Sequence, residues 1–209
     1  MRRFKKIRGH KRIWGYIEDW KNHLKHLDIS YVKENKRDYI KVWVPPYRNI
    51  SITNSAIAPP KGKTRQKIVE GIFEIYSNWK TQLDNLGEPY YLKIWYFPQD
   101  VSKCQVVCAI GEAIDYYSNT FFNPGIEKTF PEDLKSLDWE YRIQEFHLTE
   151  EDIDEPDLFA SYDDYLENKR WVESKMKDPR TRIWEGENAY GIPATIYSFK
   201  EYDVWIGGE

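Results

Sequence analysis

Apolar side chains recur at intervals of three and four residues in three stretches of the chain, the spacing that gathers them on one face of a helix. These stretches cover residues 14–27, 64–86 and 162–176. The second keeps its apolar stripe throughout, and Gly87 follows where a helix commonly ends. The third begins after Ser161, which has an acid three residues later, as in a capping box. The pattern therefore predicts three helices.

Elsewhere apolar and polar positions alternate, which is the period of a half-buried strand. The alternation predicts strands over residues 29–33, 38–44, 90–97, 103–110, 112–117, 139–148, 181–185 and 195–206. The first two flank a polar turn and are typical of a hairpin, which Pro45 and Pro46 end. The three runs within 90–117 are joined by short turns and are typical of an antiparallel meander. Residues 47–63 predict a long connection.

Strands joined by tight turns favour an α+β fold, because parallel strands would need helical crossovers between them. We therefore expect an α+β fold in which a largely antiparallel, or mixed, sheet packs against about three helices. A chain of 209 residues fits one domain. The expected organisation is a basic N-terminal arm over residues 1–13 and a single α+β domain over residues 14–209.

Two features within these elements leave alternatives open. Residues 39–46 and 91–98 share a pattern in which Tyr, Lys and Trp alternate with apolar residues and a Pro follows. Two helix-to-sheet units lying side by side would explain the similarity, and so would shared β propensity. Gly71 lies inside the helix predicted over 64–86, where glycine costs about 1 kcal/mol relative to alanine. It indicates either a backbone packed closely against the helix or a tolerated defect.

The composition places large rings in the core and indicates a soluble, cytoplasmic protein. The chain has 9 Trp and 16 Tyr, and each large ring buries roughly 150–250 Å². No apolar run approaches the roughly 18 residues that cross a bilayer, and the basic start lacks the apolar segment of a signal peptide. Cys104 and Cys108 lie about 13 Å apart along one predicted strand, which is beyond disulfide reach. They are expected to be free thiols.

The formal net charge of -3 conceals two opposite patches. Residues 1–13 carry seven basic side chains and no acid, whereas residues 145–167 carry ten acids and no Lys or Arg. The basic arm interleaves cations with apolar side chains, which allows a nucleic-acid interpretation. The overall acidic balance disfavours a nucleic-acid partner, since the acidic patch can neutralise the arm within the same chain.

No motif reaches the specificity of a catalytic or metal-binding signature. The sequence at 62–64, Gly-Lys-Thr, precedes a helix but lacks the first glycine of a phosphate-binding loop. His23 and His26 have a spacing that can hold a metal, but no further ligand motif accompanies them. Residues 150–155 lack the order of an EF-hand loop, and nothing positions a nucleophile for His147. Catalytic residues thus stay unknown, and we predict no metal and no cofactor.

The leading hypothesis is a non-catalytic cytosolic binding protein that engages a protein partner through charged and aromatic surface. The candidate binding residues are Arg2, Arg3, Lys5, Lys6, Arg8, Trp43 and Trp95. The alternative for the two tryptophans is a place in the core. The alternative function is a hydrolase-type enzyme with carboxylates in an aromatic cleft, and a weaker one is nucleic-acid binding through the arm. No membrane partner is expected, and the sequence does not decide the oligomeric state.

Overall fold

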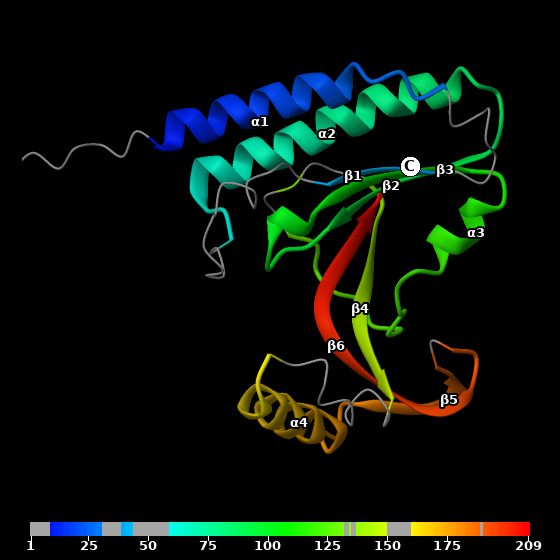
Figure 1. Ribbon diagram of the computed structural model, residues 1–209. Helices are drawn as coiled ribbons and strands as arrows, with labels where there is room; N and C mark the ends of the chain where they lie inside the picture. Colours follow the sequence, from blue (N-terminus) through cyan, green and yellow to red (C-terminus); the bar gives the residue numbers. More distant parts are fainter. Residues whose placement is uncertain are drawn as a thin grey trace, which may run out of the picture. The chain divides into compact units, whose positions relative to one another are not determined.

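Strand β3 (Gln105–Ile110) lies between two other strands of the sheet, and all six of its residues are buried. The structure is a computed structural model that describes residues 9–30, 39–43, 59–131, 134, 137–149, 160–188 and 190–209. Strands β1 (Tyr39–Trp43) and β2 (Tyr90–Tyr96) pair with β3 on its two sides, and both run antiparallel to it (Figure 1). The apolar run of β3 is therefore that of a strand covered on both faces.

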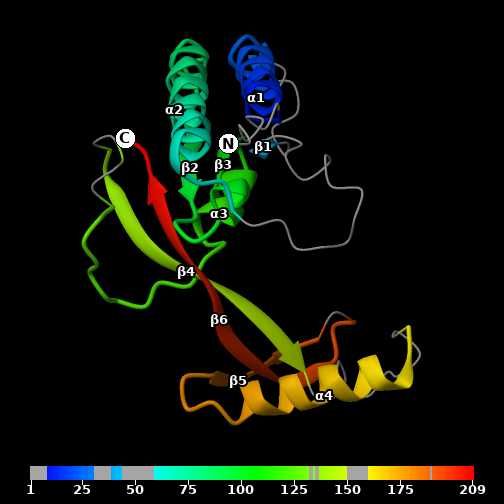
Figure 2. The same ribbon diagram turned by 90° about the vertical axis from the view of Figure 1, so that its left-hand side faces the viewer.

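The remaining elements complete an α+β fold, as the alternation of apolar residues predicts. The described strands have the order β1-β3-β2-β6-β4, with β5 paired to β6. Figure 2 shows β4 and β6 running in opposite directions. The other elements are α1 (Gly9–Lys25), α2 (Gly62–Asp84), the short 3₁₀ helix η3 (Val101–Lys103), α3 (Ala113–Ser118), β4 (Trp139–Thr149), α4 (Tyr162–Met176), β5 (Arg182–Glu187) and β6 (Pro193–Gly207).

The chain divides into two compact units that share β4 and β6. Unit 1 is formed by Met1–Arg142 with Asp203–Glu209, and unit 2 by Ile143–Tyr202. The single domain expected over residues 14–209 stays a prediction. Helix α1 begins at Gly9, inside the segment assigned to the basic arm, whereas residues 1–8 lie outside the described residues.

In unit 1, helices α1 and α2 lie together on one face of the strands β1, β2 and β3, and α3 lies on the other face (Figure 1). The apolar stripe predicted for the second helix is confirmed. Its buried residues include Ile68, Ile72, Ile75, Trp79 and Leu83. Burial of this stripe against the sheet supplies most of the stabilisation of such a helix, since propensity alone is marginal.

Hydrogen bonds from α2 hold the C-terminal end of α1. The indole Nε1 of Trp79 donates to the backbone oxygen of Leu24 at 2.9 Å. The side-chain amide of Gln82 donates to the oxygen of Leu27 and accepts from the backbone nitrogen of Ile29, both at 3.0 Å. These bonds satisfy one backbone group in the last turn of α1 and two in the segment that follows it.

Gly71 is required by a side chain and not by another backbone. It is buried where α2 meets α1, and a Cβ atom built on it would lie 2.9 Å from a ring carbon of Trp20. Real Cβ atoms do not approach other atoms this closely. The helix therefore carries a glycine at this position because the indole ring of α1 occupies the space.

Ion pairs join the exposed sides of the same two helices, and they predict a pH dependence of stability. Glu18 lies 2.8 Å from both Lys21 and Lys67. Hydrogen bonds from Lys21 and then Lys67 lower the pKa of Glu18 from 4.5 to about 2. The carboxylate thus stabilises the fold above pH 4.5, and this contribution is lost as the pH falls from 4.5 through 2.

We expect Glu18→Gln to reduce the free energy of unfolding by about 0.5–1 kcal/mol at pH 7, because solvent screens a side chain that is 40% exposed. The difference from the wild type should vanish near pH 2. Urea unfolding at a series of pH values measures it, with Asp19→Asn on the neighbouring exposed residue as the control. A difference that persists unchanged at pH 2 would contradict the assignment.

The two similar segments lie symmetrically about β3. Each strand presents the shared pattern in the same register, so equivalent residues face the same β3 residue from opposite sides. The equivalent pairs are Tyr39 and Tyr91 opposite Ala109, Lys41 and Lys93 opposite Val107, and Trp43 and Trp95 opposite Gln105. Each strand also follows one of the two packed helices along the chain. The two strands flank β3, and duplication and shared β propensity are both compatible with this arrangement.

Most predicted elements are confirmed, including α4 with its cap. The Ser161 hydroxyl accepts from the backbone nitrogen of Asp164 at 3.2 Å. One prediction is wrong, because the strand expected over residues 112–117 is absent and Ala113–Ser118 form the helix α3, which Glu112 precedes as the N-cap. Gly111 adopts a positive φ of 62° after β3, and the chain then turns into a helix with Tyr117 buried. Ala113, Ile114 and Tyr117 have the spacing of one helix face.

Two further strand predictions are modified. Ile29 and Ser30 are not part of a strand, and residues 31–33 lie outside the described residues. The described partner of β1 is β3, so the hairpin expected between 29–33 and 38–44 is not observed in the described part of the chain. The strand expected from 103 begins at Gln105, because residues 101–103 form η3.

Unit 2 has its own small core. Helix α4 packs against one face of the strands, where Leu148, Val172 and Phe199 are buried with Met176 beside them. The side chain of Glu145 on β4 is held by Arg182 of β5, whose Nε donates to it at 2.9 Å. Alternation along the strands places this pair on the face opposite to α4.

Candidate functional site

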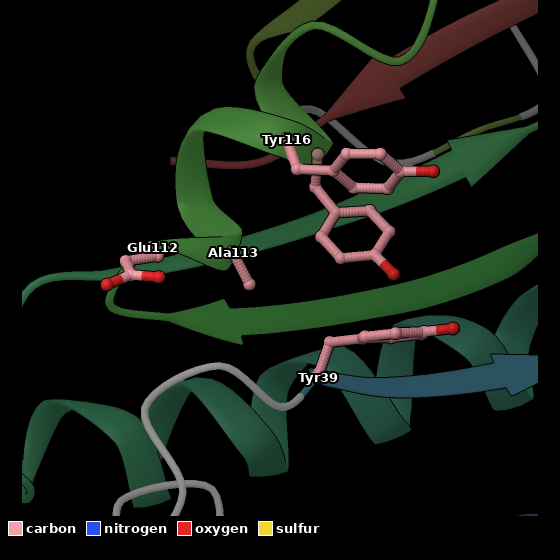
Figure 3. Close-up of a pocket in the computed structure, with 5 residues that line it drawn as sticks. Tyr39, Glu112, Ala113 and Tyr116 are labelled. Atoms are coloured by element: carbon pink, nitrogen blue, oxygen red, sulfur yellow. The ribbon is translucent and has the colours of Figure 1, made fainter. Parts of the chain in front are cut away.

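A pocket of about 380 Å³ lies in unit 1, on the side of the sheet that carries α3 (Figure 3). We call it the tyrosine pocket. Its lining residues are Tyr39, Glu112, Ala113, Tyr116 and Tyr117. Tyr39 comes from the first residue of β1, and the other four come from α3 and the residue that caps it. The pocket therefore joins segments that are far apart in the sequence.

Local sequence rules explain how these side chains converge. Successive residues of a strand point to opposite faces, so the burial of Ile40 toward the helices directs Tyr39 to the other face. In α3, residues three and four apart share one side, which brings Tyr116 and Tyr117 over the same surface as Ala113. The positive φ of Gly111 lets the chain reverse direction between β3 and this helix.

The floor of the pocket is a cluster of buried rings. The ring of Tyr117 lies 4.6 Å from that of Tyr39, 6.3 Å from that of Tyr91 and 5.9 Å from that of Trp95, measured between centroids. The indole Nε1 of Trp95 donates to the Tyr91 hydroxyl at 2.8 Å. Phe121 packs edge-on against Trp95 at 4.8 Å. This ring cluster fixes the positions of the lining side chains.

The rings above this floor are accessible to solvent. Tyr39 is 47% exposed and Tyr116 is 70% exposed, although both are large aromatic residues. Figure 3 shows their hydroxyl groups directed to the same side, away from the carboxylate of Glu112. An accessible pair of tyrosine rings on a rigid base offers apolar area and hydrogen bonding at little entropic cost.

The phenols of the floor keep their protons at neutral pH. Burial, followed by a hydrogen bond with Tyr39, raises the pKa of Tyr117. Burial likewise raises the pKa of Tyr91 to about 12. A tyrosine acting as a base would need the opposite shift. These hydroxyls therefore serve as hydrogen-bonding groups.

Charge near the pocket is acidic on α3 and basic on β1. Residues 111–127 contain Glu112, Asp115 and Glu127 and no Lys or Arg. Lys41 lies two residues beyond Tyr39 on the same face of β1, with its Nζ 5.0 Å from the centroid of the Trp95 ring. Desolvation lowers the pKa of Lys41. The ring cluster thus already accommodates one ammonium group.

The structure describes only some of the binding residues that were predicted from the sequence. Trp95 is 2% exposed, so its ring supports the pocket from below and is not presented to a partner. The side chain of Trp43 and the cations Arg2, Arg3, Lys5, Lys6 and Arg8 lie outside the described residues. The sequence reasoning missed Tyr116 and Tyr117, because it assigned them to a strand. Their spacing from Ala113 was the available signal.

Unit 2 contains a serine and a histidine in hydrogen-bonding contact. The Nδ1 of His147 lies 2.7 Å from the Oγ of Ser198, which also accepts from the indole Nε1 of Trp184 at 2.7 Å. A nucleophilic serine needs both a base and access to its substrate. Ser198 is fully buried within β6. The arrangement links three strands through side chains and does not expose a nucleophile.

Other sequence motifs have structural roles where the structure describes them. Thr64, of the Gly-Lys-Thr sequence, accepts a hydrogen bond from the indole Nε1 of Trp14 at 3.0 Å. Within the described ranges, no group of three or more His, Cys, Asp or Glu side chains could hold a metal ion. The helices that the structure describes include none with enough length and apolar character to cross a membrane.

Comparison with protein-family models, with curated proteins and with solved structures finds no match for this chain. The functional argument therefore starts from the tyrosine pocket itself.

Proposed function

We propose that this chain is a non-catalytic, cytosolic binding protein that holds a protein partner at the tyrosine pocket. The observation that carries the proposal is the exposure of Tyr39 and Tyr116 above a buried ring cluster. Tyrosine is enriched at the energetic centres of protein interfaces, where a preformed aromatic surface needs little ordering on binding. The volume of the pocket suits one side chain of a partner better than a large cofactor.

The chemistry of the lining supports binding over catalysis. Glycoside hydrolysis uses two carboxylates about 5–9.5 Å apart, whereas Glu112 is the one carboxylate among the described residues that line the pocket. The pKa of Tyr117 is raised, so its hydroxyl stays protonated at neutral pH and does not act as a base. A hydrolase-type enzyme stays the alternative for the chain, and nucleic-acid binding through residues 1–13 stays the weaker one.

Capture of partners with matched variants tests the proposal. The full chain, immobilised and exposed to a lysate of its native host, is expected to retain a protein that Tyr116→Ala retains about tenfold less, because an interface tyrosine of this kind contributes roughly 2 kcal/mol or more. The control is Tyr190→Ala, which removes another highly exposed tyrosine, from unit 2. Quantitative mass spectrometry measures the retained protein.

The two variants distinguish binding at a specific site from nonspecific binding through exposed aromatic residues. Equal retention by the wild type and by Tyr116→Ala would refute binding at the pocket. Equal loss in both variants would point to nonspecific aromatic contacts, and it would also refute the proposal. Circular dichroism of each variant establishes that the fold is retained.

A further inference from the structure

The outer edge of β5 carries backbone groups that do not bond to β6. Just beyond β5, the backbone nitrogen of Asn188 donates to the oxygen of Ile192 at 2.8 Å, in the same register as the pairing of β5 with β6. Hydrogen-bonded pairs alternate along an antiparallel ladder, so the even-numbered residues of β5 bond to β6. The N–H and C=O groups of Ile183, Glu185 and Glu187 therefore point away from β6.

This outer edge is open within the described part of the chain. No second described strand pairs with β5 there, and no backbone hydrogen bond among the described residues reaches the outward groups. Neighbouring side chains lean toward β6. The indole Nε1 of Trp184 donates to Ser198 at 2.7 Å, and the carboxylate of Glu185 accepts from the hydroxyl of Thr195 at 3.2 Å. An open edge of this kind can pair with a further strand.

One face of the edge is apolar at one end and acidic at the other. Alternation places the side chains of Ile183, Glu185 and Glu187 on this face. Ile183 is 60% exposed, and both acidic residues are exposed. No ion pair within the described residues neutralises either carboxylate, and a hydrogen bond from a neutral hydroxyl leaves the charge of Glu185 in place.

The basic side chains around this face are engaged elsewhere. Residues 182–202 contain two of them, Arg182 and Lys200, and alternation places both on the opposite face. There Arg182 donates to Glu145. Before β5, the guanidinium group of Arg180 pairs with the carboxylate two residues earlier, and on α4 the Nζ of Lys175 lies over aromatic rings. The acidic face therefore suits a segment that brings its own positive charge.

We infer that the open edge of β5 receives an extended segment of a partner protein, which adds to unit 2 as an antiparallel strand. Main-chain hydrogen bonds provide affinity in this mode of recognition, and alternate side chains provide specificity. The segment carries an apolar residue opposite Ile183 and a Lys or Arg opposite Glu185 and opposite Glu187. The site goes beyond the proposed function, because none of its residues line the tyrosine pocket.

The charges disfavour a second copy of β5 as the occupant. Twofold antiparallel pairing would place Glu185 and Glu187 of both copies on one face, where like charges on neighbouring strands are destabilising. The N-terminal sequence of the chain itself contains Arg3, Lys5 and Ile7 at alternate positions. The experiment below therefore includes a variant of this sequence.

Titration of the full chain with a short peptide tests the inference. The probe is acetyl-Thr-Lys-Thr-Lys-Thr-Ile-Thr-amide, and the readout is the backbone amide signals of Ile183, Glu185 and Glu187 in NMR spectra. We expect saturable shifts of these signals. The same peptide with glutamate at both lysine positions should bind about tenfold more weakly or less tightly still, because it exchanges two attractive charge pairs for repulsive ones.

Two N-methylated forms of the probe test the strand pairing itself. In the expected register, the N–H of the second lysine points at Glu185, whereas the N–H of the threonine that follows points away from β5. Methylation of that lysine nitrogen should weaken binding about fivefold or more, because it removes a hydrogen bond. Methylation of the threonine nitrogen is the matched control and should change the affinity less than twofold.

Variants of the protein assign the charge preference. Glu185→Gln and Glu187→Gln should each weaken binding of the lysine probe about two- to fivefold. Glu167→Gln is the matched control, because it removes one exposed carboxylate from α4 in the same unit. It should leave the affinity unchanged. Amide spectra establish that each variant is folded.

Several results would overturn the inference. They are equal affinity for the lysine and glutamate peptides, equal effects of the two N-methyl groups, equal effects of Glu187→Gln and Glu167→Gln, or no shift of the three amide signals. Tighter binding of the probe to the double variant Arg3→Gln with Lys5→Gln would show that the chain's own N-terminal sequence competes for the edge. Shifts of the same signals with protein concentration alone would assign the edge to a second copy. Either finding would also refute a partner protein as the occupant.

The proposed function is tested separately. Its readout is the loss of the captured protein in Tyr116→Ala, a residue of unit 1, and the peptide titrations do not involve that side chain. Failure of the peptides to bind would leave that capture result unchanged, and retention of the partner by Tyr116→Ala would leave the peptide results unchanged.

Discussion

Replacing Trp79 with alanine is expected to lower the free energy of unfolding by about 3–5 kcal/mol, the range for deleting a large ring from a core. Trp79 is among the largest fully buried side chains, and its indole donates to the backbone oxygen of Leu24. The substitution therefore opens a cavity between α1 and α2 and removes the shorter hydrogen bond to that backbone oxygen, which keeps the one from the backbone nitrogen of Leu27. Urea unfolding followed by circular dichroism measures the loss.

The variant Trp79→Phe separates the two contributions. It keeps most of the ring volume and removes only the donor, so a loss of roughly 1–3 kcal/mol is expected. A loss below about 1 kcal/mol for Trp79→Ala would mean that the α1 and α2 pair contributes little to the stability of unit 1.

Removing Arg182 is expected to have the second largest effect, because it leaves a buried carboxylate without its guanidinium partner. The side chain of Glu145 is 6% exposed and that of Arg182 is 43% exposed. Breaking a fully buried pair costs about 3–5 kcal/mol. Since water reaches Arg182, we expect about 2–3 kcal/mol for Arg182→Met, measured by urea unfolding.

The double variant Arg182→Met with Glu145→Leu should recover most of this loss, since it removes the uncompensated charge together with its partner. The control is Arg180→Met, which breaks the exposed pair with Asp178 and should have no measurable effect. If Arg182→Met were as neutral as Arg180→Met, the pair would not stabilise unit 2.

Elements that depend on local spacing could be predicted from the sequence. The stripe of α2 extends over many turns, so its period is unambiguous. Helix α4 also carries its start signal in Ser161 and its stop in Pro179. The six residues of α3 offered no such length. Over so short a run, the periods of a strand and of a helix fit the same apolar residues, and the preceding meander favoured the strand.

The candidate site depends on contacts that no local pattern encodes. Tyr39 and Tyr117 meet only because β1 pairs with β3 and α3 folds back over that pair. The burial of Trp95 has the same origin, since α3 and Phe121 cover the face of β2 that would otherwise be open. Composition correctly indicated an aromatic core, but it did not distinguish the rings in that core from the rings above it.

The sharing of β6 between the two units determines the order in which a ribosome can complete them. Residues 203–209 belong to unit 1, and residues 205–207 among them pair with β2, where Ile94 faces Gly207. The ribosome must therefore synthesise all of unit 2 before this part of β6 can pair with β2 in unit 1. The edge of β2 stays open to solvent for that interval, and a translational pause within residues 143–202 would prolong it.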